Sequence, residues 1–380
     1  MKVEEISVYE AINSRTNNTV AAEVNGKLAF APSGASAGTY EASSFVPEDM
    51  KRFEEELKEK IEGGEFDQRS FDEALIDYDG SESLEKIGSM GIALSLAFKL
   101  AEGYEKNRYF PYPLGNAVGG GEHGGNTAIQ EFLILPVEAE SFPEAIEINS
   151  RIYREFREKH SRKIMGMNDE GALVTKMDDE ETLQKLYKVA EKHGARLGLD
   201  IAANELWNGE KYVYPEMGME LSPKQQLKFV KKIIDEYNLY YVEDPFHEDD
   251  YYNHKKLTVE TGCLIVGDDL FVTNEKRLGK GIEKGSCNSL IVKPNQVGVV
   301  SKTYKTIEKA VENDYVPVVS HRSGETCDTS ISKIALEKNI PIIKAGIADI
   351  RISKLNELLL EWQRMEKAGK NPEMGDLPLL

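Results

Sequence analysis

The sequence predicts an α/β barrel preceded by a small α+β domain, and three observations lead to this prediction. In the second half of the chain, short apolar runs alternate with stretches of helical periodicity. Most of these runs recur about every 25 residues, which is the length of one strand, one helix and two loops. Each run ends on a polar residue, at Asp200, Glu243, Asp268, Lys293, His321 and Lys344. Reactive residues at the carboxyl ends of successive strands are typical of a barrel enzyme.

The first part of the chain, residues 1–108, is expected to form the α+β domain that caps a barrel over residues 109–380. Asn and Gly turns separate three strand candidates, over residues 3–12, 18–24 and 27–31. A charged helix and then a buried helix are predicted after them, over residues 47–64 and 90–106. Strands followed by helices, without strict alternation, favour an α+β domain. The boundary is placed near Arg108, since two prolines in NRYFPYP interrupt both helix and strand there.

Beyond this boundary, strands and helices alternate. A helix over residues 178–194 has apolar residues at helical spacing, acidic residues in its first turn and Gly194 as its stop. The helix over residues 221–238 begins with Ser222 as N-cap and Pro223 at its first position. The strands between such helices are almost continuously apolar, which indicates a parallel sheet covered on both faces.

The composition excludes several classes of function. The net charge of −19 argues against a nucleic-acid partner, because such binding relies on Lys and Arg at phosphates. No apolar run approaches the roughly 18 residues that span a membrane, and the first residues lack the layout of a signal peptide. A cytoplasmic protein without a membrane partner is therefore expected. The three cysteines form no C-x-x-C pair and are interpreted as free thiols.

Asp200, Glu243 and Asp268 are the first candidates for chemistry. In a barrel, all three carboxylates would point into the same mouth, where they repel one another unless a cation neutralises them. Hard oxygen ligands without a His or Cys cluster favour Mg²⁺. Alternatively, each acid only caps the helix that follows its strand.

Lys293 and Lys344 end two further runs. Burial and a nearby cation would lower the pKa of such a lysine, so that a neutral amine could act as a general base. Both lysines could instead be ion-pair partners of the carboxylates. The SHRSGE segment offers Arg322 and Ser323 as anion contacts, or is a polar loop that caps a helix.

Three other segments are notable. PSGASAGTYEA, residues 32–42, is rich in small residues and is either a surface loop or a lid over a ligand. GGGEHGG, residues 119–125, matches a dinucleotide fingerprint but lacks the preceding strand and the following helix. His123 within it and Glu131 beyond it remain site candidates. DPFHEDDYYNH, residues 244–254, is interpreted as a solvated acidic loop, not as a metal site.

In this order, the segments resemble the enolase family. The resemblance extends over most of the chain, through PSGASAGTYEA, GGGEHGGNTAIQEFLILP, NDEGA, GLDIAANE, YYVEDPFHEDD, IVGDDLFVTN, LIVKPNQVG, VVSHRSGETCDTSI and IKAG with SKLNELLL. It implies a Mg²⁺-dependent lyase that interconverts 2-phosphoglycerate and phosphoenolpyruvate through a metal-stabilised enediolate. Two Mg²⁺ ions per site are implied, the second arriving with substrate. By analogy, a homodimer or higher homo-oligomer is also expected.

The resemblance assigns a role to each candidate residue. Asp200, Glu243 and Asp268 match ligands of the first Mg²⁺, and Ser36 matches a loop ligand of the second. Lys293 matches the base that removes the proton next to the carboxylate. Glu170, with Glu131 behind it, matches the acid that helps hydroxide leave. The remaining matches are contacts to substrate: Arg322 and Ser323 to its phosphate, Lys344 to its carboxylate, and His123 and His321 nearby.

Several segments depart from the family pattern. SRTNNT stands at residues 14–19 in place of SRGNPT, and Gly171 is followed by Ala172 instead of a second glycine. The segment after Lys344 is shortened to GIADIR. These changes leave two alternatives open: a paralogue that uses the same base and metal on another carboxylate substrate, and a non-catalytic binding protein with the same fold.

Overall fold

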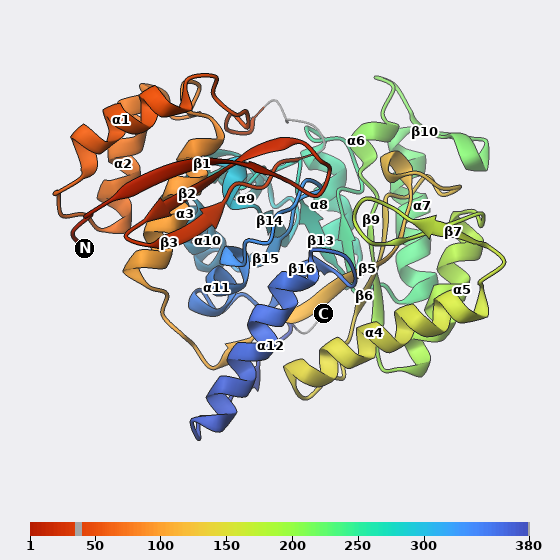
Figure 1. Ribbon diagram of the computed structural model, residues 1–380. Helices are drawn as coiled ribbons and strands as arrows, with labels where there is room; N and C mark the ends of the chain where they lie inside the picture. Colours follow the sequence, from red (N-terminus) through yellow and green to blue (C-terminus); the bar gives the residue numbers. More distant parts are fainter. Residues whose placement is uncertain (35–39, 379–380) are drawn as a thin grey trace.

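A computed structural model describes residues 1–34 and 40–378, and it begins with a small α+β domain (Figure 1). Strands β1 (Ile6–Ile12), β2 (Asn18–Val24) and β3 (Lys27–Phe30) form an antiparallel sheet. Three helices follow, namely α1 (Met50–Ile61), α2 (Gln68–Asp79) and α3 (Ser89–Glu102). The apolar helix α3 packs against β2 and β3 and contacts α2 and α10, which explains why nearly all of it is buried. The expected capping domain is confirmed, with α2 as an additional helix.

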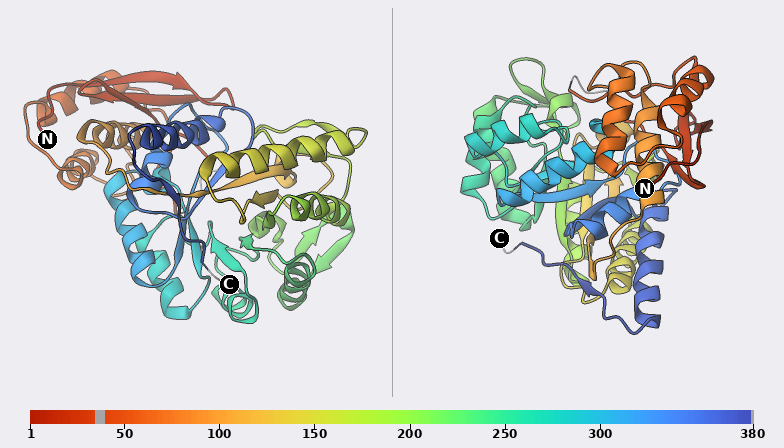
Figure 2. Two further views of the ribbon diagram at one scale, coloured as in Figure 1. Left: turned by 90° about the horizontal axis from the view of Figure 1, so that it is seen from below. Right: turned by 90° about the vertical axis from the view of Figure 1, so that its left-hand side faces the viewer.

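The rest of the chain forms a closed barrel of eight strands (Figure 2). In their order around the ring, the strands are β5 (Tyr112–Gly119), β6 (Glu131–Leu135), β9 (Arg196–Asp200), β12 (Tyr241–Glu243), β13 (Leu264–Gly267), β14 (Ser289–Val292), β15 (Val316–Ser320) and β16 (Ile342–Gly346). Pairing of β16 with β5 closes the ring. The predicted barrel is confirmed, but β6 runs antiparallel to both of its neighbours.

Helices surround the barrel strands, and smaller elements decorate them. The helices are α4 (Phe142–Lys159), α5 (Asp179–Lys192), α6 (Ala203–Leu206), α7 (Pro223–Tyr237), α8 (Tyr251–Glu260), α9 (Glu275–Lys284), α10 (Val300–Glu312), α11 (Ser330–Glu337) and α12 (Ile352–Lys367). The short strands are β4 (Tyr109–Phe110), β7 (Ile164–Met167), β8 (Leu173–Thr175), β10 (Tyr212–Tyr214), β11 (Met219–Leu221) and β17 (Glu373–Met374). Single 3-10 turns are η1 (Gly121–His123), η2 (Pro215–Met217) and η3 (Pro294–Gln296). None of the helices in the described part of the chain has the length and apolarity needed to cross a membrane.

Local sequence signals fix the helix ends. Helix α7 begins with a capping box between Ser222 and Gln225, and it ends at Asn238 in the left-handed conformation. Helix α5 begins at Asp178, whose carboxylate accepts the Glu181 N–H. Both predicted helices are thus confirmed nearly to the residue.

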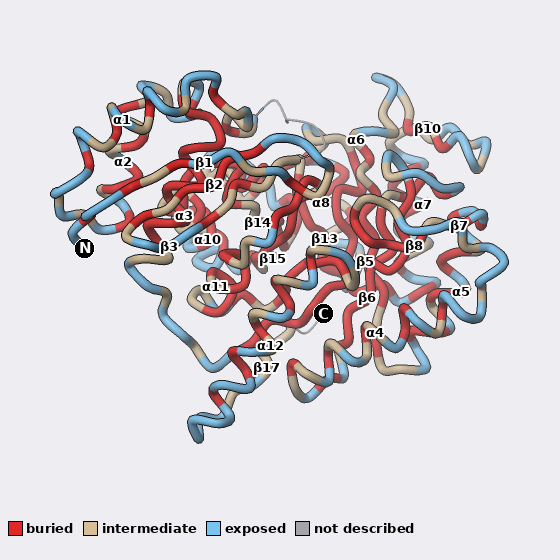
Figure 3. The backbone as a smooth tube through the Cα atoms, in the orientation of Figure 1, coloured by how far each residue is buried: buried red, intermediate tan, exposed pale blue. Residues whose placement is uncertain are grey.

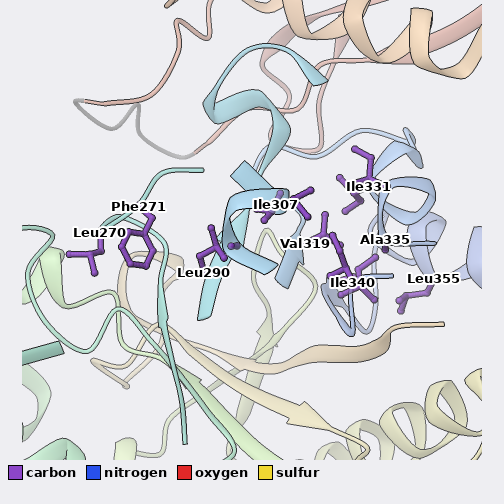
Figure 4. Close-up of a cluster of buried hydrophobic side chains, with 14 of the residues drawn as sticks. Leu270, Phe271, Leu290, Ile307, Val319, Ile331, Ala335, Ile340 and Leu355 are labelled. Atoms are coloured by element: carbon purple, nitrogen blue, oxygen red, sulfur yellow. The ribbon is translucent and has the colours of Figure 1, made fainter. Parts of the chain in front are cut away.

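Two apolar layers hold the barrel together. Apolar side chains of the strands fill its interior, among them Leu133, Tyr241, Val266, Ile291 and Ile342. A larger cluster lies between the strands and the outer helices, and Figure 4 shows part of it around β14, β15 and helices α10 to α12. In Figure 3 the barrel strands are buried while the helices expose one face to solvent. The strands are therefore covered on both faces, as their continuous apolarity indicates.

The strand ends lie close to their expected positions. Asp200 and Glu243 end their strands, and Asp268, Lys293 and His321 directly follow theirs. Lys344 is different, because it is the third residue of β16 and not its end. The expected boundary after residue 108 falls between α3 and β4, and we propose it as the domain boundary.

Candidate active site

The polar strand ends meet in a cavity of about 110 Å³ at one mouth of the barrel. Alternation along the strands helps to explain this meeting, because on four of them the residue two positions before the polar residue belongs to the apolar interior. Tyr241 precedes Glu243 in this way, and Ile291 precedes Lys293. Predicted residues lining the cavity are His123, Glu131, Glu170, Asp200, Asp268, Lys293, His321, Arg322, Ser323 and Lys344. Glu243 lies beneath them and is fully buried.

Asp200 and Glu243 are neighbours because β9 pairs with β12 in a register that places them side by side. Lys344 reaches them from β16, four strands away from β12 in the ring. Its Nζ lies 2.9 Å from Asp200 Oδ2 and 2.6 Å from Glu243 Oε2. Burial lowers the pKa of Lys344, but these carboxylates and Glu131 outweigh burial and raise that pKa well above its usual value. Lys344 is thus a buried ammonium ion and not a neutral base.

Glu131 reaches the same mouth because β6 is antiparallel. Its first residue, not its last, therefore lies level with the ends of the parallel strands, and Glu131 is directly paired with Asp200. Glu131 Oε2 lies 3.4 Å from Lys344 Nζ. A rule that looks only at strand ends does not find this residue.

Asp268 makes the third predicted carboxylate. Its Oδ1 accepts a hydrogen bond from Gln296 Nε2 at 3.1 Å, and its Oδ2 forms an ion pair with Lys293. Burial lowers the pKa of Lys293, but Asp268 and Glu243 outweigh burial and raise that pKa above its usual value. Without a cation in the site, Asp268 and Glu243 thus favour the charged form of Lys293, whereas the expected neutral amine depends on a nearby cation.

The three carboxylates have the chemistry of a Mg²⁺ site. Glu243 Oε1 is buried and has no hydrogen-bond partner among the described residues, so this oxygen is available as a ligand. Among those residues, two groups place ligand atoms within 4.8 Å of one another: Glu131, Glu170 and His321, and Asp244, Asp268 and Asp269. Asp200 and Glu243 instead share the ammonium group of Lys344, and Asp268 pairs with Lys293. Their hard oxygens fit Mg²⁺ if these two ammonium groups move aside.

Glu131 and Glu170 are neighbouring carboxyl groups with opposite pKa shifts. Burial raises the pKa of Glu131 to about 8, against the opposing effect of Lys344. Burial also acts to raise the pKa of Glu170, but the positive charges of His123 and Arg351 outweigh it and lower that pKa. At neutral pH the proton of this pair therefore resides on Glu131.

The two histidines differ in charge. His123 Nδ1 lies 2.8 Å from Asp169 Oδ1. Burial lowers the pKa of His123, but Asp169 and Glu170 outweigh burial and raise it to about 9. Burial and the charge of Arg351 lower the pKa of His321 well below its usual value. His321 Nδ1 accepts the Gly346 N–H at 3.1 Å, which places the proton of this neutral ring on Nε2.

Arg322 is an anion contact, as expected, but its partner here is Glu41. The guanidinium donates from Nη1 to Glu41 Oε2 at 3.1 Å and from Nη2 to the same oxygen at 3.0 Å. Both side chains are buried. Sequence reasoning missed Glu41, although it lies within the small-residue segment that was considered a lid. The predicted metal ligand in that segment, Ser36, lies outside the described residues.

Arg351 is a second residue that sequence reasoning missed. It is fully buried and donates to three backbone carbonyls, those of Asp169 at 3.1 Å, Arg322 at 3.2 Å and Ser323 at 2.6 Å. It thereby joins the loop that carries Glu170 to the loop that carries Arg322. Its sequence signal was weak, because GIADIR was considered only as a shortened segment.

The sequence interpretation of residues 244–254 is wrong. Asp244 and His254 are buried, so the segment is not a solvated acidic loop. His254 lies in α8, and its Nδ1 is 2.8 Å from the Asp250 carbonyl oxygen. GGGEHGG forms the turn η1, and no helix follows it, as expected. The expectation that no strand precedes it is wrong, because β5 ends at Gly119.

Comparisons with known proteins indicate the same family over nearly the whole chain. Residues 3–110 match the family model described as "Enolase, N-terminal domain", and residues 107–371 match "Enolase, C-terminal TIM barrel domain". A protein of Archaeoglobus fulgidus named "Enolase" is 39% identical over 395 residues, which cover 97% of this chain and 98% of the relative. A protein of Methanosphaera stadtmanae with the same name is 40% identical over 414 residues, covering 99% of both.

Proposed function

The chain belongs to the enolase family and is a lyase of the phosphopyruvate hydratase class, and from this we propose that it removes water from 2-phosphoglycerate in a Mg²⁺-dependent reaction. The product would be phosphoenolpyruvate, and the pathway served by this class is glycolysis. The reaction breaks a C–H bond next to the carboxylate and a C–O bond at the neighbouring carbon.

The observation that carries the proposal is the placement of base and acid on opposite sides of the barrel. Lys293 follows β14 and Glu131 begins β6, and these strands are four apart in the ring of eight. Glu170 lies beside Glu131, with carboxylate oxygens within 4.8 Å of each other. A substrate between them would meet an amine on one side and a carboxyl group on the other. An elimination needs this arrangement, since the proton and the hydroxyl group leave from different carbons.

In this proposal the residues move protons as follows. Lys293 first releases its ammonium proton to solvent, and its neutral Nζ then accepts the proton from the substrate carbon. The Glu131–Glu170 pair holds a proton at neutral pH and supplies it to the departing hydroxyl group, which leaves as water. His321 presents its Nε2–H to the same region. Asp200, Glu243 and Asp268 would hold Mg²⁺, which when bound offsets the negative charge that develops on the substrate carboxylate.

Arg322 and Ser323 would contact the phosphate, and Lys344 the carboxylate. Arg322 is suited to this role because its planar fork already holds the carboxylate of Glu41. Ser36 would contribute to a second Mg²⁺ that binds with the substrate. We also propose a cytoplasmic homodimer or higher homo-oligomer, without a nucleic-acid partner given the net charge of −19.

The test is to mix purified protein with 2-phosphoglycerate and Mg²⁺ and to follow enol absorbance. Lys293→Ala should lower kcat by about 10²- to 10⁴-fold, the usual contribution of a general base. Lys305→Ala is the matched control, because Lys305 lies on the exposed face of α10 and pairs with Glu275, far from the cavity residues named above. Unchanged kcat in Lys293→Ala would refute the assignment of the base. An inactive wild type would redirect the proposal to another carboxylate substrate.

A further inference from the structure

Asp244 follows Glu243 and lies at the point where three barrel strands end. These strands are β9, β12 and β13, which are adjacent in the sheet and carry Asp200, Glu243 and Asp268. Asp244 itself is buried, with 4% of its surface exposed.

The backbone of Asp244 joins its strand to both neighbours. Its N–H donates to the Val266 carbonyl on β13 at 3.0 Å. Its carbonyl accepts the N–H of Ala203 at 3.0 Å, in the segment that follows β9. The residue has a positive φ of 39°, which is uncommon for a residue other than glycine. Such strain persists only where surrounding contacts hold it, and it is concentrated at functional sites.

The carboxylate of Asp244 holds the turn that carries Asp268. Oδ1 accepts the Asp268 N–H at 3.0 Å, and Oδ2 accepts the Asp269 N–H at 2.8 Å. Two consecutive backbone N–H groups are therefore fixed by the two oxygens of one side chain. The direction in which the Asp268 side chain leaves the backbone depends on this turn.

We propose that Asp244 is a positioning residue for the Mg²⁺ site, which fixes the three ligand-bearing strand ends relative to one another and orients Asp268. The inference rests on the proposed function, since it takes Asp200, Glu243 and Asp268 as the ligands. The role of Asp244 is to hold the two N–H groups that its oxygens accept, and the metal ligands are taken to be Asp200, Glu243 and Asp268. Residues that orient metal ligands in this way affect metal affinity strongly.

The test compares Mg²⁺ binding and stability in Asp244→Asn. The asparagine has the same shape, but its amide nitrogen cannot accept a hydrogen bond, so one of the two N–H groups loses its acceptor. Calorimetry on protein freed of metal with EDTA should give a Kd for Mg²⁺ about 10-fold or more weaker than that of wild type. The KM for substrate measured at saturating Mg²⁺ should change much less than this Kd.

Asp79→Asn is the matched control. Asp79 Oδ2 accepts the consecutive N–H groups of Lys86 and Ile87, both at 2.8 Å, within the N-terminal domain. Because both N–H groups bond to one oxygen, the amide oxygen of the asparagine can still accept both, and this variant should bind Mg²⁺ as wild type does. Equal Mg²⁺ affinity in Asp244→Asn and wild type would overturn the proposal and leave Asp244 a purely structural role.

Hydrogen exchange on the wild type gives a second test that does not need the variant to fold. The Asp268 and Asp269 amides should exchange slowly before Mg²⁺ is added, because Asp244 already holds them. Fast exchange that becomes slow only with Mg²⁺ would overturn the proposal. A wild type that binds no Mg²⁺ would instead overturn the proposed metal site itself, and with it the role given to Asp244.

Discussion

Lys344→Met is the substitution whose effect the structure determines most directly. Lys344 is 3% exposed, and its ammonium group lies within 4 Å of three carboxylates, those of Asp200, Glu243 and Glu131. Methionine has a similar length but no charge. The variant would therefore leave buried negative charges without their cation, while the packing of the barrel mouth would change little.

The expected cost follows from these contacts. Breaking a buried ion pair by removing one partner costs about 3–5 kcal/mol. We expect a loss in this range at pH 7.5, measured by urea unfolding in the presence of EDTA. Burial already raises the pKa values of Glu243 and Glu131 in the folded state above their unfolded values, and loss of the Lys344 charge raises them further. The folded variant then binds more protons than the unfolded chain, so its stability falls as pH rises and recovers as pH falls toward 5.

Lys354→Met is the control for this experiment. Lys354 is also buried and forms an ion pair with Glu325, but this pair contains one carboxylate instead of three. Its loss of stability should therefore depend less on pH. A loss below about 1 kcal/mol in Lys344→Met, or a loss that is the same at pH 7.5 and pH 5, would refute the reasoning, because neither fits a cation that neutralises buried carboxylates.

Two further predictions concern stability away from the site. Burial lowers the pKa of His254 to about 4, below its unfolded value. The free energy of unfolding of wild type, measured with urea, should therefore fall by about 2 kcal/mol between pH 7 and pH 5. His254→Gln should not show this loss. In α9, Gly281→Ala should cost about 1–3 kcal/mol because its Cβ would lie 2.4 Å from Phe271 Cε1. Gly279→Ala on the same helix meets only the flexible Lys309 Nζ and should stabilise by about 0.5–1 kcal/mol. The first prediction would be contradicted if the stability of wild type and of His254→Gln depended on pH in the same way. The second would be contradicted if both glycine variants were stabilised or both were destabilised.

The sequence predicts most of the site because the barrel repeats one rule. Each parallel strand carries its reactive residue at its carboxyl end, so Asp200, Glu243, Asp268, Lys293 and His321 could be found from spacing alone. The direction of β6 has no such signal, because a short apolar run looks the same in either direction. For this reason Glu131 was a candidate only as the acidic residue beyond GGGEHGG, and the family resemblance, not the strand pattern, gave it a role.

Contacts between distant segments were the other part that the sequence did not reveal. Glu41 meets Arg322 across 281 positions, and Arg351 meets Asp169 across 182. No local periodicity encodes such pairs. Helix α2 is a different case, because its signals were present in the sequence: Asp67 caps its first turn and Gly80 ends it.

Glu131 and Glu170 allow the electrostatic description of the site to be tested without substrate. The folded-state pKa of Glu131 is raised to about 8, so between pH 4.5 and pH 8 the folded chain keeps a proton that the unfolded chain releases, and wild type loses stability as pH rises. Glu131→Gln removes this loss. Its stability relative to wild type should rise by up to about 3 kcal/mol between pH 5 and pH 8, measured by urea unfolding in EDTA.

The pKa of Glu170 is lowered instead, so its charged form stabilises the fold at neutral pH and that contribution is lost as pH falls. The stability of Glu170→Gln relative to wild type should therefore fall as pH rises from acid to neutral. If the stability of both variants relative to wild type changed with pH in the same direction, the proton would not be held on Glu131. The acid in the proposed elimination would then have to be reassigned.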